Sequence, residues 1–180
     1  TGTLTANAMT ARALVTAQTR YRISGEGYSP GGEIRSENEA QTAGAEDPVL
    51  ARAATVALLC NDADINEQDG HWQLHGDPTE GALLALALKH GLRTDLRTEQ
   101  KRLDSLPFET ERRYMATLHP DPDPDTGPWM AIKGAPDRLL ELCDQQLSPQ
   151  GPELLDNAYW QDQMEQLAHQ GMRVLALASK

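Results

Sequence analysis

Apolar residues recur along this chain at two different spacings, and each spacing predicts a different kind of element. Helical spacing follows an Asp-Pro pair and predicts a buried helix over residues 48–60. The longest apolar stretch, "GALLALALKHG", predicts a second helix with a sharp end at Gly91. Two more helices are expected, one opened by Pro136 and one that ends at Gly171.

Runs of β-branched and aromatic residues predict strands between these helices. A polar turn separates two of the runs, which indicates an antiparallel pair, and an acidic Asp-Gly turn indicates a tight hairpin. The glycine, proline and acid content of residues 25–47 predicts a long exposed loop. The expected strands lie within residues 11–24, on both sides of residues 69–70, and at 103–108, 114–119, 129–134 and 173–178.

The order of these elements predicts the fold class. Strands occur in hairpins or in pairs separated by helices, and no internal repeat is visible. The chain of 180 residues has the length of one domain, and 39% of it is hydrophobic, which suffices for a core. We therefore expect an α+β fold in which an antiparallel β-sheet is flanked by helices.

Composition and charge narrow the classes of function. The net charge of −11 disfavours nucleic-acid binding, but it still permits a small phosphorylated ligand where basic residues gather. No apolar run reaches the roughly 18 residues of a membrane span, and no leader marks the chain for export. Cys60 and Cys143 lack metal-ligand spacing, so we expect reduced, buried thiols and no metal site. No nucleophile with an adjacent base is identified, so no catalytic residue is predicted.

The stretch "GDPTEGAL" opens the second expected helix. Asp77, Pro78, Thr79 and Glu80 fit the N-cap and the first three helical positions, with Glu80 closing a capping box. A helix start of this kind needs no ligand. The alternative interpretation is that the helix start faces a ligand, and that Glu80 accepts a hydrogen bond from an amine or hydroxyl group of that ligand.

An aromatic residue ends the strand expected at residues 103–108, and two cations follow it closely. Phe108 is the only phenylalanine, and it stands beside a polar turn that contains Arg112 and Arg113. One interpretation is a core aromatic. The other is a stacking surface for a planar base, with cations beside it that meet phosphate groups.

Two further cations stand at strand ends. Lys133 ends an apolar strand, and Gly134 after it would let a ligand approach the backbone closely. This pair suits an anion-binding corner, whereas a lysine at a strand end usually extends into water. Arg173 begins the last expected strand, where a salt bridge at the rim is the simpler interpretation.

Several short blocks, taken in order, resemble the nucleotide-binding domain of type II P-type cation-transporting ATPases, the group of the calcium and sodium/potassium pumps. The blocks are "TGTLT", "GDPTEGALL", "PFETERRYM", "KGAPDRLLELC" and "GMRVLALA". The first is similar to the second part of the phosphorylation signature Asp-Lys-Thr-Gly-Thr-Leu-Thr. The resemblance implies a remnant of the phosphorylation-domain strand and hinge at residues 1–10 and a nucleotide-binding domain at 11–180. It also implies that the phosphorylated aspartate and its lysine precede Thr1.

The resemblance implies a role for each matching residue around the adenine ring. Phe108 would stack on adenine, and Glu80 would meet the adenine amino group. Lys133 would line the adenine pocket, and Gly134 would allow the close approach of the ligand.

The resemblance also implies cations near the phosphates. Arg113 stands where the calcium pumps typically have a lysine, and Arg173 matches an arginine on the phosphate or ribose side. Further contacts of the ligand with Asp77, Thr79 and Arg112 are expected as secondary ones, and Thr1 matches a threonine near the γ-phosphate. The sequence departs from the calcium pumps at Thr110, where those proteins have arginine, so Arg112 is the candidate to replace that phosphate contact.

The function implied by the resemblance is ATP binding within an ATP-driven cation pump. The domain would bind ATP or ADP without turnover and position ATP so that its γ-phosphate reaches a catalytic aspartate elsewhere in the pump. Magnesium would be bound mainly by parts of the pump outside this chain. The expected partners are the phosphorylation and actuator domains of the same parent, at the cytoplasmic face of a membrane, most simply the bacterial plasma membrane.

Two other functions remain open at this point. A phosphatase of the haloacid dehalogenase type shares the start of the phosphorylation signature, but it would need its nucleophilic aspartate and a later magnesium motif inside the chain. An acidic module that binds a basic partner would need neither, and it would not respond to ATP. The transported ion is not determined by these residues, and calcium is only the choice that the type II resemblance suggests.

Overall fold

The computed structural model describes residues 8–37, 47–121, 123 and 125–180. Within these ranges it has an α+β fold, and its paired strands are antiparallel, which confirms the expected class. The helices are α1 (Pro48–Leu59), α2 (Pro78–Lys89), α3 (Leu96–Glu99), α4 (Pro136–Leu142) and α5 (Asn157–His169). The strands are β1 (Ala13–Val15), β2 (Arg20–Ile23), β3 (Ile34–Ser36), β4 (Asp64–Gln68), β5 (His71–His75), β6 (Asp104–Leu106), β7 (Tyr114–His119), β8 (Trp129–Gly134), β9 (Gln145–Ser148), β10 (Gly151–Leu154) and β11 (Ala176–Ser179).

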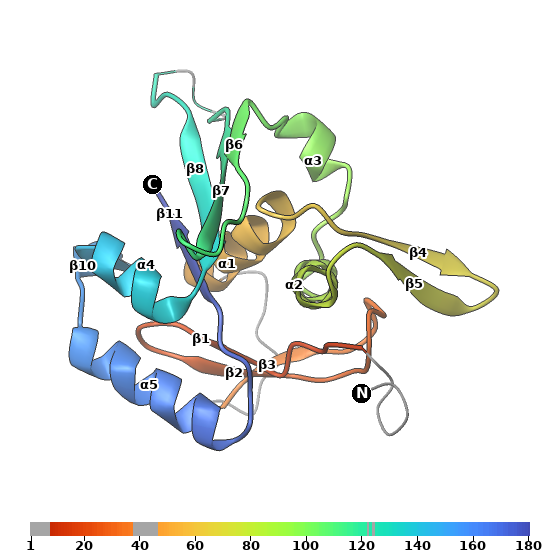
Figure 1. Ribbon diagram of the computed structural model, residues 1–180, viewed down its shortest axis with the longest axis horizontal. Helices are drawn as coiled ribbons and strands as arrows, with labels where there is room; N and C mark the ends of the chain where they lie inside the picture. The colour runs from red at the N-terminus through yellow and green to blue at the C-terminus, as the bar shows by residue number, and fades with distance from the viewer. Residues whose placement is uncertain (1–7, 38–46, 122, 124) are drawn as a thin grey trace.

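The strands form one four-stranded sheet and three smaller units, where the sequence suggested a single sheet. The larger sheet has the order β11-β8-β7-β6, and the smaller ones are β1-β2-β3, β4-β5 and β9-β10. Helices α1 and α2 lie together between the larger sheet and the β1-β2-β3 sheet (Figure 1). The helices therefore separate two antiparallel layers, and this layering sets which side chains meet in the interior.

Two clusters of buried apolar side chains fix α1 between these layers. Towards the four-stranded sheet, α1 buries Val56, Leu59 and Cys60 against Met115, Trp129 and Ala131. Towards the β1-β2-β3 sheet, Leu50 and Ala57 of α1 pack in one cluster with apolar residues of α2. The strands contribute Leu14, Tyr21, Ile23 and Ile34 to the same cluster. Because α1 is buried on two sides, removing its apolar residues would disrupt both layers.

The helix boundaries follow the local signals that the sequence contains. Asp47 caps α1, since its Oδ1 accepts from the backbone N–H groups of Val49 at 2.8 Å and Leu50 at 3.2 Å. Helix α2 ends next to Gly91, whose φ of +98° suits glycine. The turn between β4 and β5 has positive φ at both Asp69 and Gly70, as a tight hairpin requires.

Other elements differ from expectation. Strand β3 lies inside the segment expected to be a loop, because Ile34 pairs with Ile23 and is only 3% exposed. Helix α3 and the β9–β10 hairpin were not predicted, and β11 begins at Ala176, three residues later than expected. The strand expected at 103–108 covers only Asp104–Leu106, so Phe108 lies beyond it. These elements are only three or four residues long, so each carries too little pattern to be predicted from the sequence.

The expected domain boundary, membrane spans and metal sites can be compared with the structure only within the described residues. Residues 1–7 lie outside the described residues, so the expected boundary at residue 10 and the role of Thr1 stay predictions. None of the helices in the described part of the chain is long and apolar enough to cross a bilayer. No group of three or more potential metal-binding side chains gathers within the described residues either.

Candidate functional site

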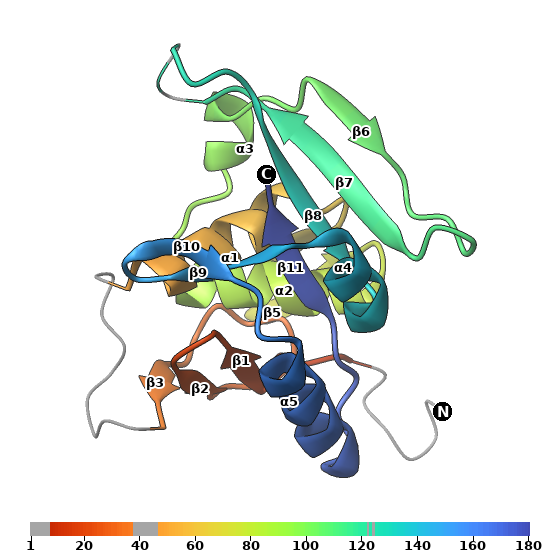
Figure 2. The same ribbon diagram turned by 90° about the vertical axis from the view of Figure 1, so that its left-hand side faces the viewer.

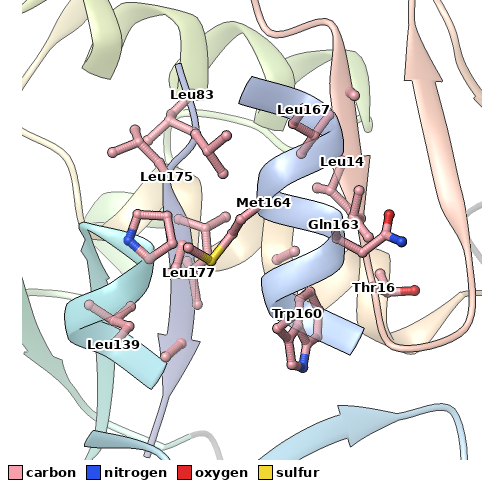
Figure 3. Close-up of a pocket in the computed structure, with 18 of the residues that line it drawn as sticks. Leu14, Thr16, Leu83, Leu139, Trp160, Gln163, Met164, Leu167, Leu175 and Leu177 are labelled. Atoms are coloured by element: carbon pink, nitrogen blue, oxygen red, sulfur yellow. The ribbon is translucent and has the colours of Figure 1, made fainter. Parts of the chain in front are cut away.

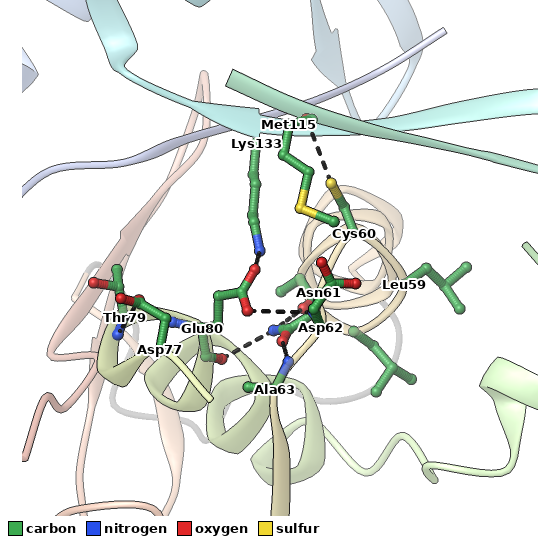
Figure 4. A network of polar contacts seen from close by, with 12 residues as sticks. Leu59, Cys60, Asn61, Asp62, Ala63, Asp77, Thr79, Glu80, Met115 and Lys133 are labelled. Carbon is green, nitrogen blue, oxygen red and sulfur yellow. Dashed lines mark hydrogen bonds and ion pairs between the residues drawn. The ribbon is translucent and has the colours of Figure 1, made fainter. Parts of the chain in front are cut away.

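Glu80 and Lys133 form a buried ion pair between two elements that are far apart in sequence. Lys133 lies on β8 and Glu80 in the first turn of α2, and the ammonium group of Lys133 donates to Glu80 Oε1. Their side chains are only 9% and 17% exposed. The interpretation that Lys133 extends into water is therefore wrong, because its ammonium group points into the molecule (Figure 4).

Glu80 does not close the expected capping box. Its second oxygen, Oε2, accepts from the backbone N–H of Asp62 at 3.3 Å. Asp77 caps α2, and its Oδ1 accepts from the N–H groups of Thr79 at 2.8 Å and of Glu80 at 3.2 Å. The N-cap position of Asp77 is thus confirmed. The carboxylate of Glu80 turns to Lys133 because a charge-assisted hydrogen bond is stronger than one to a neutral N–H group.

Asn61 connects the end of α1 to the start of α2. Its side-chain amide donates to the carbonyl oxygens of Ala57 at 3.0 Å and Glu80 at 2.9 Å, and its Oδ1 accepts from Ala63 N at 2.9 Å (Figure 4). Asn61 is 3% exposed, so each of these contacts replaces one with water. Asn61 was not predicted from the sequence, although a polar amide directly after a buried helix is a signal for a cap.

Two arginines hold the segment that follows α1. Arg102 binds Asp62 Oδ1 at 2.7 Å and donates to the carbonyl oxygen of Asn61 at 3.1 Å. Arg97 donates to the carbonyl oxygens of Leu58 at 3.1 Å and Ala63 at 3.0 Å. Cations suit the carbonyl-rich end of a helix, so both arginines stabilise the backbone that supports Glu80. We call Glu80, Lys133, Asn61, Asp62 and Arg102 the Glu80 network.

Cys60 packs beside the Glu80 network without reactive character. Its Sγ contacts the carbonyl oxygen of Met115 at 3.5 Å, and the residue is fully buried. Burial raises the pKa of the Cys60 thiol, which keeps it protonated. Both Cys60 and Cys143 are free thiols, as expected.

The connection between β6 and β7 carries the predicted aromatic residue. Phe108 is 60% exposed, and it is the only aromatic among the large exposed apolar side chains of the described residues. The interpretation as a core aromatic is therefore wrong. The register pairs Leu106 with Ala116 and Tyr114 with Gly134, so this connection lies at the end of the sheet where β8 ends (Figure 2).

The two arginines of this connection are held by neighbouring acids. Arg113 has a positive φ of 60° and pairs with Asp137 at 2.7 Å, while Arg112 pairs with Glu109 at 3.0 Å. The guanidinium of Arg113 lowers the pKa of Asp137 through their hydrogen bond. Both arginines lie near solvent, so these pairs are weak and exchangeable.

Gly134 is needed for packing whether or not a ligand is present. A Cβ atom at this position would lie 2.5 Å from Tyr114 Cβ and 2.6 Å from the carbonyl oxygen of Arg113. The close approach is thus between β8 and β7. The expectation that Gly134 admits a ligand stays a prediction.

Arg173 lies between α5 and β11. It is exposed, and its side chain has no ion pair or hydrogen bond within the described ranges, so the expected salt bridge is absent there. Strand β11 enters the sheet with Ala176 paired to Gly134. The segment with Arg173 therefore approaches the same sheet end as the connection with Phe108 (Figure 2).

The structure thus brings the predicted residues together to different degrees. Glu80 and Lys133 are in direct contact, and the register places Phe108, Arg113, Gly134 and Arg173 towards the same end of the four-stranded sheet. Asp77 serves as a helix cap. The arrangement presents a carboxylate, an ammonium group, an exposed aromatic ring and nearby cations, which are groups suited to a planar, phosphorylated ligand.

A protein-family comparison identifies the class to which this domain belongs. Residues 49–180 match the model of the P-type ATPase cytoplasmic domain N, so the chain belongs to that family. The cation-transporting ATPase pma1 of Synechocystis is 40% identical over 100% of this chain. The calcium-transporting ATPase of Bacillus subtilis and the bovine calcium-transporting ATPase type 2C member 1 are 31% and 34% identical over 99% of it. The chain spans only 19–20% of the length of these relatives.

Proposed function

We propose that this domain binds ATP or ADP, with the purine against Phe108 and next to the Glu80–Lys133 pair. One observation carries the proposal: a buried ammonium–carboxylate pair joins β8 to α2, and Phe108, the one strongly exposed apolar aromatic among the described residues, lies towards the same sheet end. Membership of the P-type ATPase N-domain family supports it. The carboxylate of Glu80 suits a purine amino group, the ammonium group of Lys133 suits a ring nitrogen, and Phe108 suits stacking.

Binding of the phosphates is assigned to Arg113 and Arg173, with Arg112 in a secondary role. Arg113 would exchange the carboxylate of Asp137 for phosphate oxygens, which costs little because both side chains are about half exposed. Arg173 has no partner to give up among the described residues. Magnesium would enter with the nucleotide, bound to its phosphates, since the chemistry of this site offers cations to the phosphates rather than metal ligands.

The proposed role in the whole protein is positioning. The relatives are named as cation-transporting ATPases, and we infer that the parent of this chain is an ATP-driven pump of the same kind at the cytoplasmic face of a membrane. The domain would hold ATP and present its γ-phosphate to a catalytic aspartate of the phosphorylation domain. This chain would contribute orientation, and the bond-breaking step would belong to other parts of the pump.

A nucleotide titration followed by amide NMR tests the proposal. We expect saturable shifts at the Gly134 end of the sheet, with a dissociation constant of about 0.1–1 mM for an isolated domain that forms only part of the site. The variant Phe108→Ala should weaken binding by about 1–3 kcal/mol through lost stacking. Leu154→Ala is the matched control, because Leu154 is 84% exposed and lies on β10.

Two outcomes would overturn the proposal in different ways. Unchanged affinity in Phe108→Ala would remove the stacking role from that residue. A complete lack of shifts with ATP in the folded wild type would favour an acidic interaction module instead, because such a module has no reason to respond to a nucleotide.

A further inference from the structure

A cavity of about 390 Å³ lies beneath α5, next to the Glu80 network but lined by none of its members. Its walls come from α5, β11, β1, α2 and α4, and it includes neither Glu80 nor Lys133 nor Phe108. Figure 3 shows apolar side chains from these elements facing one space; they include Leu14, Leu83, Leu139, Leu167, Leu175 and Leu177. Protein interiors contain few voids larger than a water molecule, so a space of this size needs an explanation.

Helix α5 forms one wall, and none of its residues is fully buried, although Trp160, Met164 and Leu167 are half-buried. Polar contacts attach it instead: Tyr159 Oη donates to the carbonyl oxygen of Thr16 at 2.6 Å, and Trp160 Nε1 donates to Gln146 Oε1 at 2.8 Å. Beyond its other end, Arg20 donates to Gln170 Oε1 at 3.1 Å. The helix is therefore held at both ends across an apolar space, which keeps that space open.

The wall has an adaptable apolar lining. Three of the five methionines of the chain, Met9, Met164 and Met172, line the cavity, and Met164 extends from α5 towards Leu177 (Figure 3). Methionine is flexible and polarisable, and it is frequent at surfaces that accept varied apolar ligands. Trp160 adds a large aromatic surface.

The charges at the cavity all have one sign. No aspartate or glutamate is among the described residues that line it, although the chain contains 27 acids and has a net charge of −11. The charged residues that line it are Arg12, Arg52 and Arg173, and none of them forms an ion pair within the described residues. Arg12 and Arg173 are exposed and Arg52 is half-buried. Arg12 donates to the carbonyl oxygen of Gly25 at 2.9 Å, and Arg52 donates to Ser179 Oγ at 3.2 Å and lies over the Trp129 ring.

We propose that the cavity beneath α5 binds a free anionic amphiphile, a molecule with a compact hydrocarbon body and one carboxylate group. The apolar walls accept the body, because burying it removes apolar surface from water. The arginines donate charge-assisted hydrogen bonds to the carboxylate, for which Arg12 and Arg52 would exchange only contacts with neutral groups. The cavity includes neither the Glu80–Lys133 pair nor Phe108, so this proposal can hold where nucleotide binding fails, although the two proposed sites share Arg173.

The test uses sodium decanoate and the chain labelled with ¹³C at the methionine methyl groups. We expect saturable shifts of Met9, Met164 and Met172, while Met115 and Met130 stay in place because they lie on the sheet outside the cavity. The uncharged 1-decanol should bind at the same methyl groups at least about tenfold more weakly, because it lacks the charge that the arginines meet. Equal affinities would overturn the anionic part of the proposal.

Variants locate the binding. Met164→Trp fills the cavity and should abolish the decanoate shifts, whereas Leu154→Trp on exposed β10 should not alter them. Leu167→Phe is a second variant that fills the cavity. It replaces Met164→Trp if that variant does not fold, as judged by the loss of cooperative unfolding. The double variant Arg12→Gln/Arg52→Gln should remove most of the difference between decanoate and decanol.

Three results would overturn the proposal. Equal shifts of all five methionines would indicate detergent-like binding. Unchanged decanoate binding in both cooperatively folded filling variants would place the ligand elsewhere. Shifts caused by phosphatidylglycerol vesicles, with none from monomeric decanoate, would point to a membrane surface rather than a free ligand.

Discussion

The Glu80 network and the cavity beneath α5 are neighbours, yet the protein builds them in opposite ways. Strand β11 links them, because Leu177 of the cavity wall pairs with Lys133 in the sheet. In the network, buried polar groups are matched by ion pairs and hydrogen bonds at short distances. Around the cavity, apolar side chains face a space that none of them fills. One region is therefore held in a single geometry, whereas the other can adapt to a ligand.

The strongest way to break this contrast is to remove one partner of the buried ion pair. Lys133→Met leaves the carboxylate of Glu80 buried without its cation and should cost about 3 kcal/mol of unfolding free energy. The double variant Glu80→Gln/Lys133→Met should recover at least about half of that loss, because it leaves no unpaired charge. Urea denaturation measures both. If Lys133→Met is as stable as the wild type, then leaving the carboxylate of Glu80 without its cation does not destabilise the fold.

A second comparison sets a packed leucine against a leucine of the cavity wall. Leu84 is fully buried, and Leu84→Ala should cost about 3 kcal/mol of unfolding free energy. Leu167→Ala should cost about 1 kcal/mol, because Leu167 of α5 faces a space and loses few contacts. Thermal and urea unfolding of the two variants provide the comparison. Similar losses would show that α5 packs as tightly as the core.

Asn61 tests whether the network depends on more than its charges. Asn61→Ala removes three buried hydrogen bonds and leaves their backbone partners unsatisfied, which should cost about 2 kcal/mol. Asn66→Ala on the exposed face of β4 is the matched control and should change the unfolding free energy by less than about 0.5 kcal/mol. If both variants lose the same amount, the link between α1 and α2 does not depend on Asn61.

The smallest expected effect is a pH dependence that originates at the sheet. His119 is buried, its Nδ1 lies 2.8 Å from the carbonyl oxygen of Gln100, and its Nε2 lies 2.8 Å from Thr117 Oγ1. Burial lowers the pKa of His119 in the folded chain, so below pH about 6.5 the unfolded chain binds more protons. Stability should be constant above pH 7 and fall as the pH drops through 6.5.

Urea midpoints between pH 7.5 and 5.5 measure this effect. His90 has a pKa lowered by burial too, so the variant His119→Gln should reduce the slope without removing it. A slope that is unchanged in His119→Gln would exclude His119 as a source.

Much of the fold could be predicted from local signals. The runs at 114–119 and 129–134 were predicted with their observed ends, and α1 differs by one residue. Helix caps, helix-ending glycines and the alternation of apolar and polar residues in strands depend on interactions within a few residues. They can therefore be identified from the sequence. The hairpin β9–β10 and strand β3 were not predicted from the sequence. Strands of three or four residues carry too little hydrophobic pattern, and their formation depends on pairing with a neighbouring strand.

The candidate site was predictable in its members but not in its contacts. Glu80 and Lys133 were both singled out, but not as partners of each other: Glu80 was expected to close a capping box or meet a ligand, and Lys133 to form an anion-binding corner or extend into water. They are 53 residues apart, and no local pattern states which partner a side chain meets across that separation. The same reason explains why Arg173 has no salt bridge to any described residue and why the role of Asn61 was not predicted.

The sequence by itself determined the types of element, their principal starts and ends, and the resemblance to the N-domain family that the comparisons confirm. Only the tertiary structure decided that Glu80 turns to Lys133, that Asn61 joins two helices, and that α5 stands across an open apolar space. Helix caps and periodicity depend on interactions within a few residues. Ion pairs and cavities depend on which distant surfaces come to face one another, and that is settled only when the layers pack.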